Sequence, residues 1–425
     1  MQELVVFIIA SDEVTNMNSL LPKYAHEICG QAMLSYSIDA GIEAGTEKLV
    51  IISNQNTNLI RELMPKDTIL IHQDEQADDN IIAHEIQSVL EKKRDATVLI
   101  LPVGYSVIRG STLKAAYDYH LAKDNQATVI TDKEGSLSDI CFINTELILT
   151  EISSLKNLGV TNSLFIKNMI KKIYSSGQKI NGYSISDSEE LIRVKDRSEL
   201  SEAERIISNR IIKKHMDNGV TFHLPETSMI HNKVKIGKDT VIHPGTQLEG
   251  NTIIGERCQI GPHSRIEDSV VKDGVYFMNS VMVQSQIEND TKVGPFAYIR
   301  PGSSIGENVK IGDFVEIKNS NIGNNSKVPH LSYIGDADVG KNVNVGCGAV
   351  VVNYDGKKKN RTSVGDHAFV GCNVNLVSPV VVNDYAYIAA GSTITEEVPE
   401  YSLAIARNRQ TIILDWVKRK GLDKK

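Results

Sequence analysis

The chain has 425 residues, enough for two or three domains, and its 46 lysines and arginines are outnumbered by 53 aspartates and glutamates. The net charge of −7 leaves no basic surplus to neutralise phosphates, so we expect no nucleic-acid partner. No basic stretch precedes the short apolar run near the amino terminus, and no segment has the ~18 apolar residues of a membrane span. We therefore expect neither a signal peptide nor membrane insertion. Five scattered cysteines without metal-ligand spacing indicate a reduced, cytoplasmic protein.

The first half of the chain alternates apolar strands with amphipathic helices. The pattern predicts strands at residues 4–10, 48–53, 68–72, 96–102 and 126–131, and helices at residues 35–44, 84–93 and 111–123. Such alternation is typical of a mostly parallel sheet with helices on both faces, whose functional groups gather at the carboxyl ends of the strands. We expect this α/β domain to cover residues 1–197 and a linker helix to follow over residues 198–219, ending at Gly219.

Beyond Gly219 the apolar period changes to six. Aliphatic residues recur every six positions in four registers, which run over residues 236–266, 293–317, 339–351 and 364–394. One inward-pointing aliphatic per six residues, with glycine or asparagine at the corners, predicts a parallel β-helix of stacked 18-residue coils. We expect this domain to cover residues 220–400, followed by a tail over residues 401–425.

Three stretches interrupt the registers, at residues 270–293, 319–339 and 353–364. We expect them to leave the β-helix as loops, and because an ejected loop loses stacking interactions, we expect function there. Two of the three carry unusual chemistry. Residues 327–336 read Lys-Val-Pro-His-Leu-Ser-Tyr-Ile-Gly-Asp, and residues 353–359 read Asn-Tyr-Asp-Gly-Lys-Lys-Lys.

These two segments, with Arg300-Pro301-Gly302 and Phe314-Val315-Glu316-Ile317-Lys318, resemble the acetyltransferase half of a known family. The family is the bifunctional N-acetylglucosamine-1-phosphate uridyltransferase/glucosamine-1-phosphate N-acetyltransferase. The resemblance covers residues 220–410 almost without gaps, and the whole chain in domain order. It implies a left-handed β-helix behind a nucleotidyltransferase-like, Rossmann-like α/β domain, with acetyl-CoA as co-substrate.

The resemblance also implies roles for individual residues. His330 corresponds to the family's catalytic base and Glu316 to the carboxylate that orients it. A histidine with a pKa near ~6.5 suits a base at neutral pH. The acceptor contacts correspond to Arg300, Lys318, Tyr333, Asn344 and Asn353. The acetyl-CoA contacts correspond to Cys347, Asn353, Tyr354, Lys359, Cys372, Ala390 and Arg407.

Two of the donor positions depart from the family pattern. Cys347 stands where alanine is usual, and Cys372 where serine is usual. Both are small, so we expect altered rather than lost donor binding. We interpret both as buried neutral thiols rather than reactive ones.

The amino-terminal domain lacks the features that its relatives use to hold a nucleotide. In the glycine-rich phosphate loop, Asp12 and Val14 replace glycines and Asn16 replaces arginine. At the two Mg²⁺ ligand positions stand Gly104, which has no carboxylate, and Lys195, which cannot ligate while protonated. The uracil-binding segment becomes residues 79–84, and Asp78 and Asp79 are interpreted as a solvated acidic loop. We expect no bound Mg²⁺ and no uridyltransferase activity.

The expected function is therefore N-acetylation of glucosamine-1-phosphate for UDP-N-acetylglucosamine supply to the cell envelope, carried out by a homotrimer. Three alternatives stay open: another amino-sugar phosphate or a teichoic or capsular precursor as acceptor, a non-catalytic assembly or regulatory subunit, and uridyltransferase activity that survives in a rearranged site. The front domain either caps the β-helix, docks a separate pyrophosphorylase, or senses a sugar nucleotide without turning it over.

Overall fold

The computed structural model describes residues 2–10, 16–54, 57–72, 79–155 and 180–423. The chain divides into two compact units, Met1–Arg210 and Ile211–Lys425. The division falls inside helix α7 (Arg197–Asp217), which covers most of the predicted linker at residues 198–219.

The first unit is built on one sheet of seven strands, in the order β5-β4-β1-β6-β8-β7-β9. All neighbouring strands are parallel except that β8 runs antiparallel to both β6 and β7. The strands are β1 (Leu4–Ile9), β4 (Lys48–Ser53), β5 (Ile69–His72), β6 (Thr97–Pro102), β7 (Ala127–Thr131), β8 (Leu137–Asn144) and β9 (Ile180–Ser184). The apolar pattern predicts the first five of these strands but not β8 and β9.

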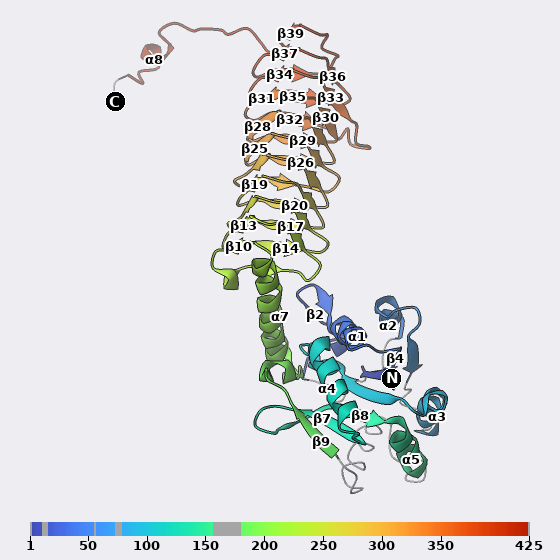
Figure 1. Ribbon diagram of the computed structural model, residues 1–425. Coiled ribbons are helices and arrows are strands. Elements are labelled where there is room, and N and C mark those ends of the chain that lie inside the picture. Colours follow the sequence, from blue (N-terminus) through green and yellow to red (C-terminus); the bar gives the residue numbers. More distant parts are fainter. Residues whose placement is uncertain (1, 11–15, 55–56, 73–78, 156–179, 424–425) are drawn as a thin grey trace. The chain divides into compact units, whose positions relative to one another are not determined.

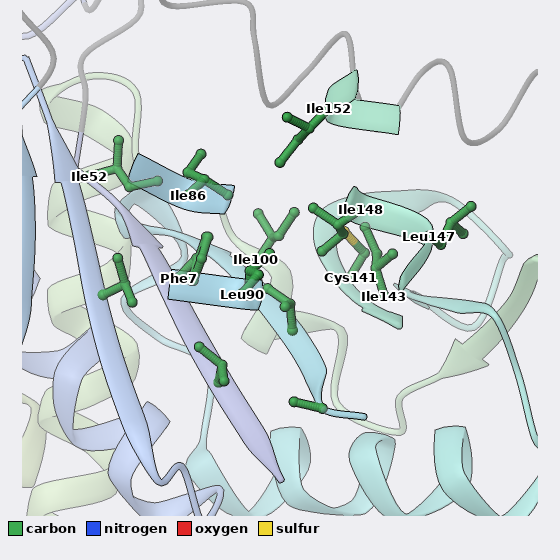
Figure 2. Close-up of a cluster of buried hydrophobic side chains, with 14 of the residues drawn as sticks. Phe7, Ile52, Ile86, Leu90, Ile100, Cys141, Ile143, Leu147, Ile148 and Ile152 are labelled. Carbon is green, nitrogen blue, oxygen red and sulfur yellow. The ribbon is translucent and has the colours of Figure 1, made fainter. Parts of the chain in front are cut away.

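Helices and short connections complete the first unit. They are α1 (Met33–Glu43), α2 (Thr57–Leu63), α3 (Asp79–Leu90), α4 (Gly110–Ala122), α5 (Thr145–Leu155), the hairpin β2 (Glu27–Ile28) and β3 (Gln31–Ala32), and 3-10 turns at Lys23–Ala25, Glu91–Lys93, Val103–Tyr105 and Ser188–Leu191. Figure 2 shows the core where α3 and α5 meet the sheet: Ile86 and Leu90 of α3 and Ile148 of α5 lie among Phe7 and Ile100. All five side chains are at most 2% exposed, so their burial stabilises the unit by about 1.5–3 kcal/mol each.

The second unit is a β-helix with three parallel sheets as its sides (Figure 1). The first side has strands β10 (Thr221–Phe222), β13 (Val241–Ile242), β16 (Gln259–Ile260), β19 (Tyr276–Phe277), β22 (Lys292–Val293), β25 (Lys310–Asp313), β28 (Lys327–His330), β31 (Asn344–Val345), β34 (Phe369–Val370), β37 (Tyr387–Ile388) and β39 (Leu403–Ala404). The second has β11 (Met229–Ile230), β14 (Gln247–Glu249), β17 (Arg265–Glu267), β20 (Val281–Val283), β23 (Tyr298–Ile299), β26 (Glu316–Lys318), β29 (Tyr333–Gly335), β32 (Val350–Val352), β35 (Asn375–Val377) and β38 (Thr393–Ile394). The third has β12 (Lys235–Ile236), β15 (Ile253–Ile254), β18 (Val270–Val271), β21 (Gln286–Ile287), β24 (Ser304–Ile305), β27 (Asn321–Ile322), β30 (Ala337–Val339), β33 (Thr362–Val364) and β36 (Val381–Val382). A 3-10 turn, Pro225–Thr227, and a short helix, α8 (Trp416–Arg419), complete the unit.

The predicted hexapeptide logic is confirmed in the register of these sides. Ile236 pairs with Ile254 and Ile242 with Ile260, so one coil consumes 18 residues. The repeated aliphatic side chains fill the interior; Ile242, Ile260 and Leu248, for example, are fully buried. The predicted fold class, a Rossmann-like α/β domain followed by a left-handed parallel β-helix, is confirmed.

The predicted behaviour of two interruptions is wrong. Residues 270–293 and 319–339 do not leave the β-helix, because strands β18 to β22 and β27 to β30 continue all three sides through them. Their coils are shorter: Gln259 pairs with Tyr276, and Arg265 with Val281. Dropping a residue or two at the corners breaks the sixfold period without breaking the coil. Only residues 353–361 form an ejected loop, since Asp338 pairs with Ser363, 25 positions later.

Candidate functional site

Several predicted site residues share one corner of the β-helix. Five coils in succession place a residue immediately before a backbone position with positive φ, and these residues are Asp313, His330, Cys347, Cys372 and Ala390. Backbone hydrogen bonds of 2.8–3.4 Å connect each coil to the one before it at this corner. The amides of Leu331, Gly348, Asn373 and Gly391 donate to the carbonyls of Asp313, His330, Cys347 and Cys372, respectively. We call this stack the corner ladder. It lines up four predicted residues above Asp313, which was not among the predicted site residues.

His330 is held by a carboxylate from the coil below it. Its Nδ1 lies 2.5 Å from Oδ1 of Asp313, and β28 pairs with β25 in a register that sets these two residues opposite each other. The hydrogen bond from His330 lowers the pKa of Asp313 below its usual range. An ionised carboxylate only accepts, so Nδ1 carries the hydrogen and Nε2 is left as the basic nitrogen.

Glu316, the predicted partner of His330, contacts a different residue. Its Oε1 accepts from Nη1 of Arg300 at 2.7 Å, and this hydrogen bond is the main reason that the pKa of Arg300 is raised. The structure therefore brings Glu316 together with Arg300, a predicted acceptor contact. The carboxylate that contacts His330 belongs to Asp313 instead. The orienting role of Glu316 stays a prediction.

The predicted acceptor residues gather around a second aspartate, Asp336. Its side chain is 9% exposed and lies 3.1 Å from Nζ of Lys318, whose side chain is 15% exposed. Asn319 and Asn353 also donate to it, at 2.6 and 2.5 Å. Burial alone would raise the pKa of Asp336, but these three hydrogen bonds outweigh it and lower the pKa. Asp336 is thus ionised and fixes Lys318 and Asn353 in place.

Two further predicted residues lie at the edge of this cluster. The amide of Asn353 donates to the hydroxyl of Tyr333 at 3.4 Å. Lys359 neighbours Lys318, and this second ammonium lowers the pKa of Lys359. Two lysines held close together create a local surplus of positive charge, which an anionic ligand would relieve. Asn344 lies in β31, opposite Lys327 and Phe369, and no described contact joins it to the cluster.

The ejected loop that carries Tyr354 and Lys359 is organised by Asp355. Its carboxylate accepts from the amides of Lys358 and Lys357 and from the side chain of Asn360, which lowers the pKa of Asp355 to about 2. The Tyr354 hydroxyl donates to the Gly356 carbonyl at 2.8 Å, and its ring is exposed. The hydrogen bonds to Asp355 thus fix the backbone of the loop, which carries the exposed Tyr354 ring and the lysines.

The prediction that both ladder cysteines are buried is wrong. Cys372 is exposed and Cys347 is partly exposed, whereas the other three cysteines of the chain are buried. The reason is their position: the sixfold period fixes only the inward-facing side chains, and these two stand at a corner. At the upper end of the ladder, the Arg407 side chain approaches Gly391, the residue after Ala390.

The described residues at the two positions that correspond to the family's Mg²⁺ ligands do not fit a Mg²⁺ ion. Gly104 is buried, and a Cβ there would lie 3.2 Å from the carbonyl oxygen of Val194. Lys195 is exposed, and its ammonium lies 3.7 Å from the carboxylate of Glu199 in helix α7. The nearby Asp139 carboxylate is paired with Arg193. Over the described ranges, no three His, Cys, Asp or Glu residues group as a metal site would require.

Other sequence predictions for this unit are only partly covered. Asp12, Val14 and Asp78 lie outside the described residues, as do the side chains of residues 79–83. Asn16 is exposed, and its backbone amide donates to the Lys195 carbonyl at 3.2 Å. Among the described helices, none has the length and apolarity to cross a bilayer.

Comparisons with known proteins find matches to parts of the second unit and to the chain as a whole. A family model described as bacterial transferase hexapeptide (six repeats) matches residues 233–268, and one described as the GMPPB C-terminal domain matches residues 283–403. The bifunctional protein GlmU of Acetivibrio thermocellus is 44% identical, with 99% of each chain covered. That of Alkaliphilus metalliredigens is 37% identical, with 100% of each chain covered. A crystal structure of Rv0371c from Mycobacterium tuberculosis H37Rv has a TM-score of 0.37 and 12% identity, over 47% of this chain and 96% of that one, which is too distant to support an argument.

Proposed function

Since the chain belongs to the family of bifunctional GlmU proteins, we propose that its β-helix unit is an acyltransferase that moves an acetyl group from acetyl-CoA to the amine of glucosamine-1-phosphate. One observation carries the proposal. His330 is held through Nδ1 by Asp313 at the corner ladder, so that its Nε2 is basic, and the same unit holds the Arg300, Lys318 and Lys359 cations.

The histidine supplies the proton transfer that the reaction needs. The sugar amine attacks the thioester carbonyl, and its nitrogen gains a positive charge. Nε2 of His330 then takes a proton from that nitrogen. The Asp313 carboxylate fixes the ring and stabilises the imidazolium that forms. The C–S bond to coenzyme A then breaks, and the departing thiolate takes up the proton that His330 accepted, so that a C–N bond and an S–H bond replace a C–S bond and an N–H bond.

The cations supply the recognition of the acceptor. Arg300 offers a planar pair of donors that matches the geometry of a phosphate, and Lys318 offers a point charge held by Asp336. Tyr333 and Asn344 are proposed as contacts to the sugar. The cluster therefore favours an amine acceptor that also carries a phosphate over a neutral amino sugar.

The corner ladder and the ejected loop are proposed to bind the acetyl donor. Cys347, Cys372 and Ala390 rise in steps of one coil, about 4.8 Å, above His330, which suits an extended ligand lying along the corner. Arg407 at the upper end and Lys359 on the loop are proposed to meet its phosphates, and Asn353 and Tyr354 its thioester end.

We propose that the first unit has lost uridyltransferase activity. The support is chemical: Gly104 offers no ligand, its surroundings leave little room for one, and the ammonium of Lys195 cannot coordinate a cation. The product of the β-helix unit would then need a separate pyrophosphorylase to reach UDP-N-acetylglucosamine. We also propose a cytoplasmic homotrimer, which is an oligomer of closed symmetry.

Release of free coenzyme A tests the acetyl transfer. Purified protein is incubated with acetyl-CoA and a panel of acceptors: glucosamine-1-phosphate, glucosamine, galactosamine-1-phosphate and glucosamine-6-phosphate. We expect thiol release with the first acceptor and little with glucosamine, because the cations recognise phosphate. Release that is equal with and without the phosphate would remove Arg300 and Lys318 from the proposed role. No release with any amine would favour a non-catalytic subunit.

A further inference from the structure

The corner ladder contains a chemical feature that the proposed acetyl transfer does not use. Cys347 and Cys372 occupy the same corner on adjacent coils. The backbone amide of Asn373, the residue after Cys372, donates to the Cys347 carbonyl at 2.8 Å. Neighbouring strands in a sheet lie about 4.8 Å apart, within the ~4.4–6.8 Å range of Cα separations that a disulfide spans. The coils are closely packed here, since a Cβ at Gly346 would lie 2.5 Å from the Cys372 nitrogen.

These two thiols differ from the other three in the chain. Cys29 and Cys141 are buried, and burial raises the pKa of each to about 12. Cys258 is also buried, with its pKa raised for the same reason and its sulfur 3.1 Å from the Lys272 carbonyl. Such thiols stay protonated and shielded. Only Cys372, which is exposed, and Cys347, which is partly exposed, can meet a reagent from solution.

We propose that Cys347 and Cys372 form a reversible dithiol–disulfide pair that small disulfides oxidise, and that the disulfide blocks the donor side of the corner ladder. The effect on acetyl transfer rests on the proposed function, whereas the disulfide itself does not. His330 lies one coil below Cys347 at the same corner.

The oxidation has two balanced steps. The Cys372 thiolate attacks one sulfur of a small disulfide, forms a mixed disulfide and releases the first small thiolate. The Cys347 thiolate then attacks the Cys372 sulfur, the bond to the small group breaks, and a Cys347–Cys372 disulfide forms as the second thiolate leaves. The two protein thiols lose two protons and two electrons, and the small disulfide is reduced to two thiols. Cys372 reacts with the small disulfide first because it is the more exposed of the two thiols.

Thiol counting and peptide mass spectrometry test the pair without any activity assay. Full-length protein is incubated with oxidised glutathione, quenched in acid, unfolded and titrated. We expect the titratable thiols to fall from five to three, with a linked peptide that contains Cys347 and Cys372. In Cys347→Ala the resolving thiol is absent, so a glutathione adduct should persist on Cys372. In Cys372→Ser the exposed thiol is absent, so modification should be much slower.

The results separate this proposal from the proposed function. Five thiols after oxidation, or a glutathione adduct that persists in the wild type as it does in Cys347→Ala, would overturn the pair. A disulfide that leaves acetyl transfer unchanged would overturn its blocking role, whereas transfer that is lost and returns with dithiothreitol supports it. Absence of transfer in the fully reduced protein, with the disulfide still forming, would contradict the proposed function and leave the thiol pair standing.

Discussion

Replacement of Asp336 by asparagine tests how the acceptor cations are positioned. The carboxylate holds Lys318 at 3.1 Å and also accepts from Asn319 and Asn353. Asparagine keeps the shape but removes the charge, and its amide nitrogen cannot accept from an ammonium. A hydrogen bond to a charged group contributes about 1.5–3 kcal/mol, and this pair is well shielded, with side chains 9% and 15% exposed. If that free energy is lost from acceptor binding, kcat/KM for glucosamine-1-phosphate falls about 10- to 150-fold.

A neighbouring aspartate provides a matched control for this variant. Asp338 forms an ion pair with Arg361, but the two side chains are 48% and 42% exposed. An exposed pair contributes about 0–1 kcal/mol, so Asp338→Asn should change kcat/KM less than about fivefold. Thiol release at varied acceptor concentration measures both variants, and circular dichroism checks that they fold. Equal losses in the two variants, or wild-type kinetics in Asp336→Asn, would refute the positioning argument.

Three further predictions concern the base and the acid range. His330→Ala should lower turnover by about 10²–10⁴, measured as thiol release, if Nε2 accepts the amine proton; unchanged turnover would exclude it. Asp313→Asn should lower turnover, because an amide side chain can donate as well as accept and so no longer keeps the hydrogen of His330 on Nδ1; turnover equal to that of the wild type would make the contact structural only. The pKa of Asp336 is lower in the folded chain than in the unfolded one, so its stabilising effect is complete above the unfolded value of about 3.9 and is lost as the pH falls through the folded value. Acid unfolding of Asp336→Asn should therefore start from a lower stability at neutral pH and depend less steeply on pH below about 4, whereas parallel curves for variant and wild type would contradict that assignment.

The fold could be predicted because burial of each strand requires a particular pattern of apolar residues in the sequence. A strand buried on both faces must be continuously apolar, as Leu4–Ile9 is, and each side of the β-helix needs one inward aliphatic in every six residues. The antiparallel strand Leu137–Asn144 was missed because its first three residues are exposed or half-buried and two of them, Ser138 and Asp139, are polar. The shortened coils were misread as loops because a deleted corner residue looks, in sequence, like the end of the repeat.

The site could be predicted by motif but not by contact. His330 stood out in its segment, yet its partner Asp313 lies 17 positions away, and only the shortened coil places the two at the same corner. Asp336 belongs to the same segment, but its role appears only once Lys318 and Asn353 are seen to converge on it. The exposure of Cys372 could not be read from a period that reports only the interior.

One paired measurement tests the central claim, that the β-helix unit transfers acetyl groups while the α/β unit no longer transfers uridylyl groups. The same protein preparation is given acetyl-CoA with glucosamine-1-phosphate in one tube, and UTP, Mg²⁺ and N-acetylglucosamine-1-phosphate in another. We predict release of free coenzyme A in the first and no release of pyrophosphate above the enzyme-free rate in the second. Sustained pyrophosphate release, or a first tube without free thiol, would contradict the claim.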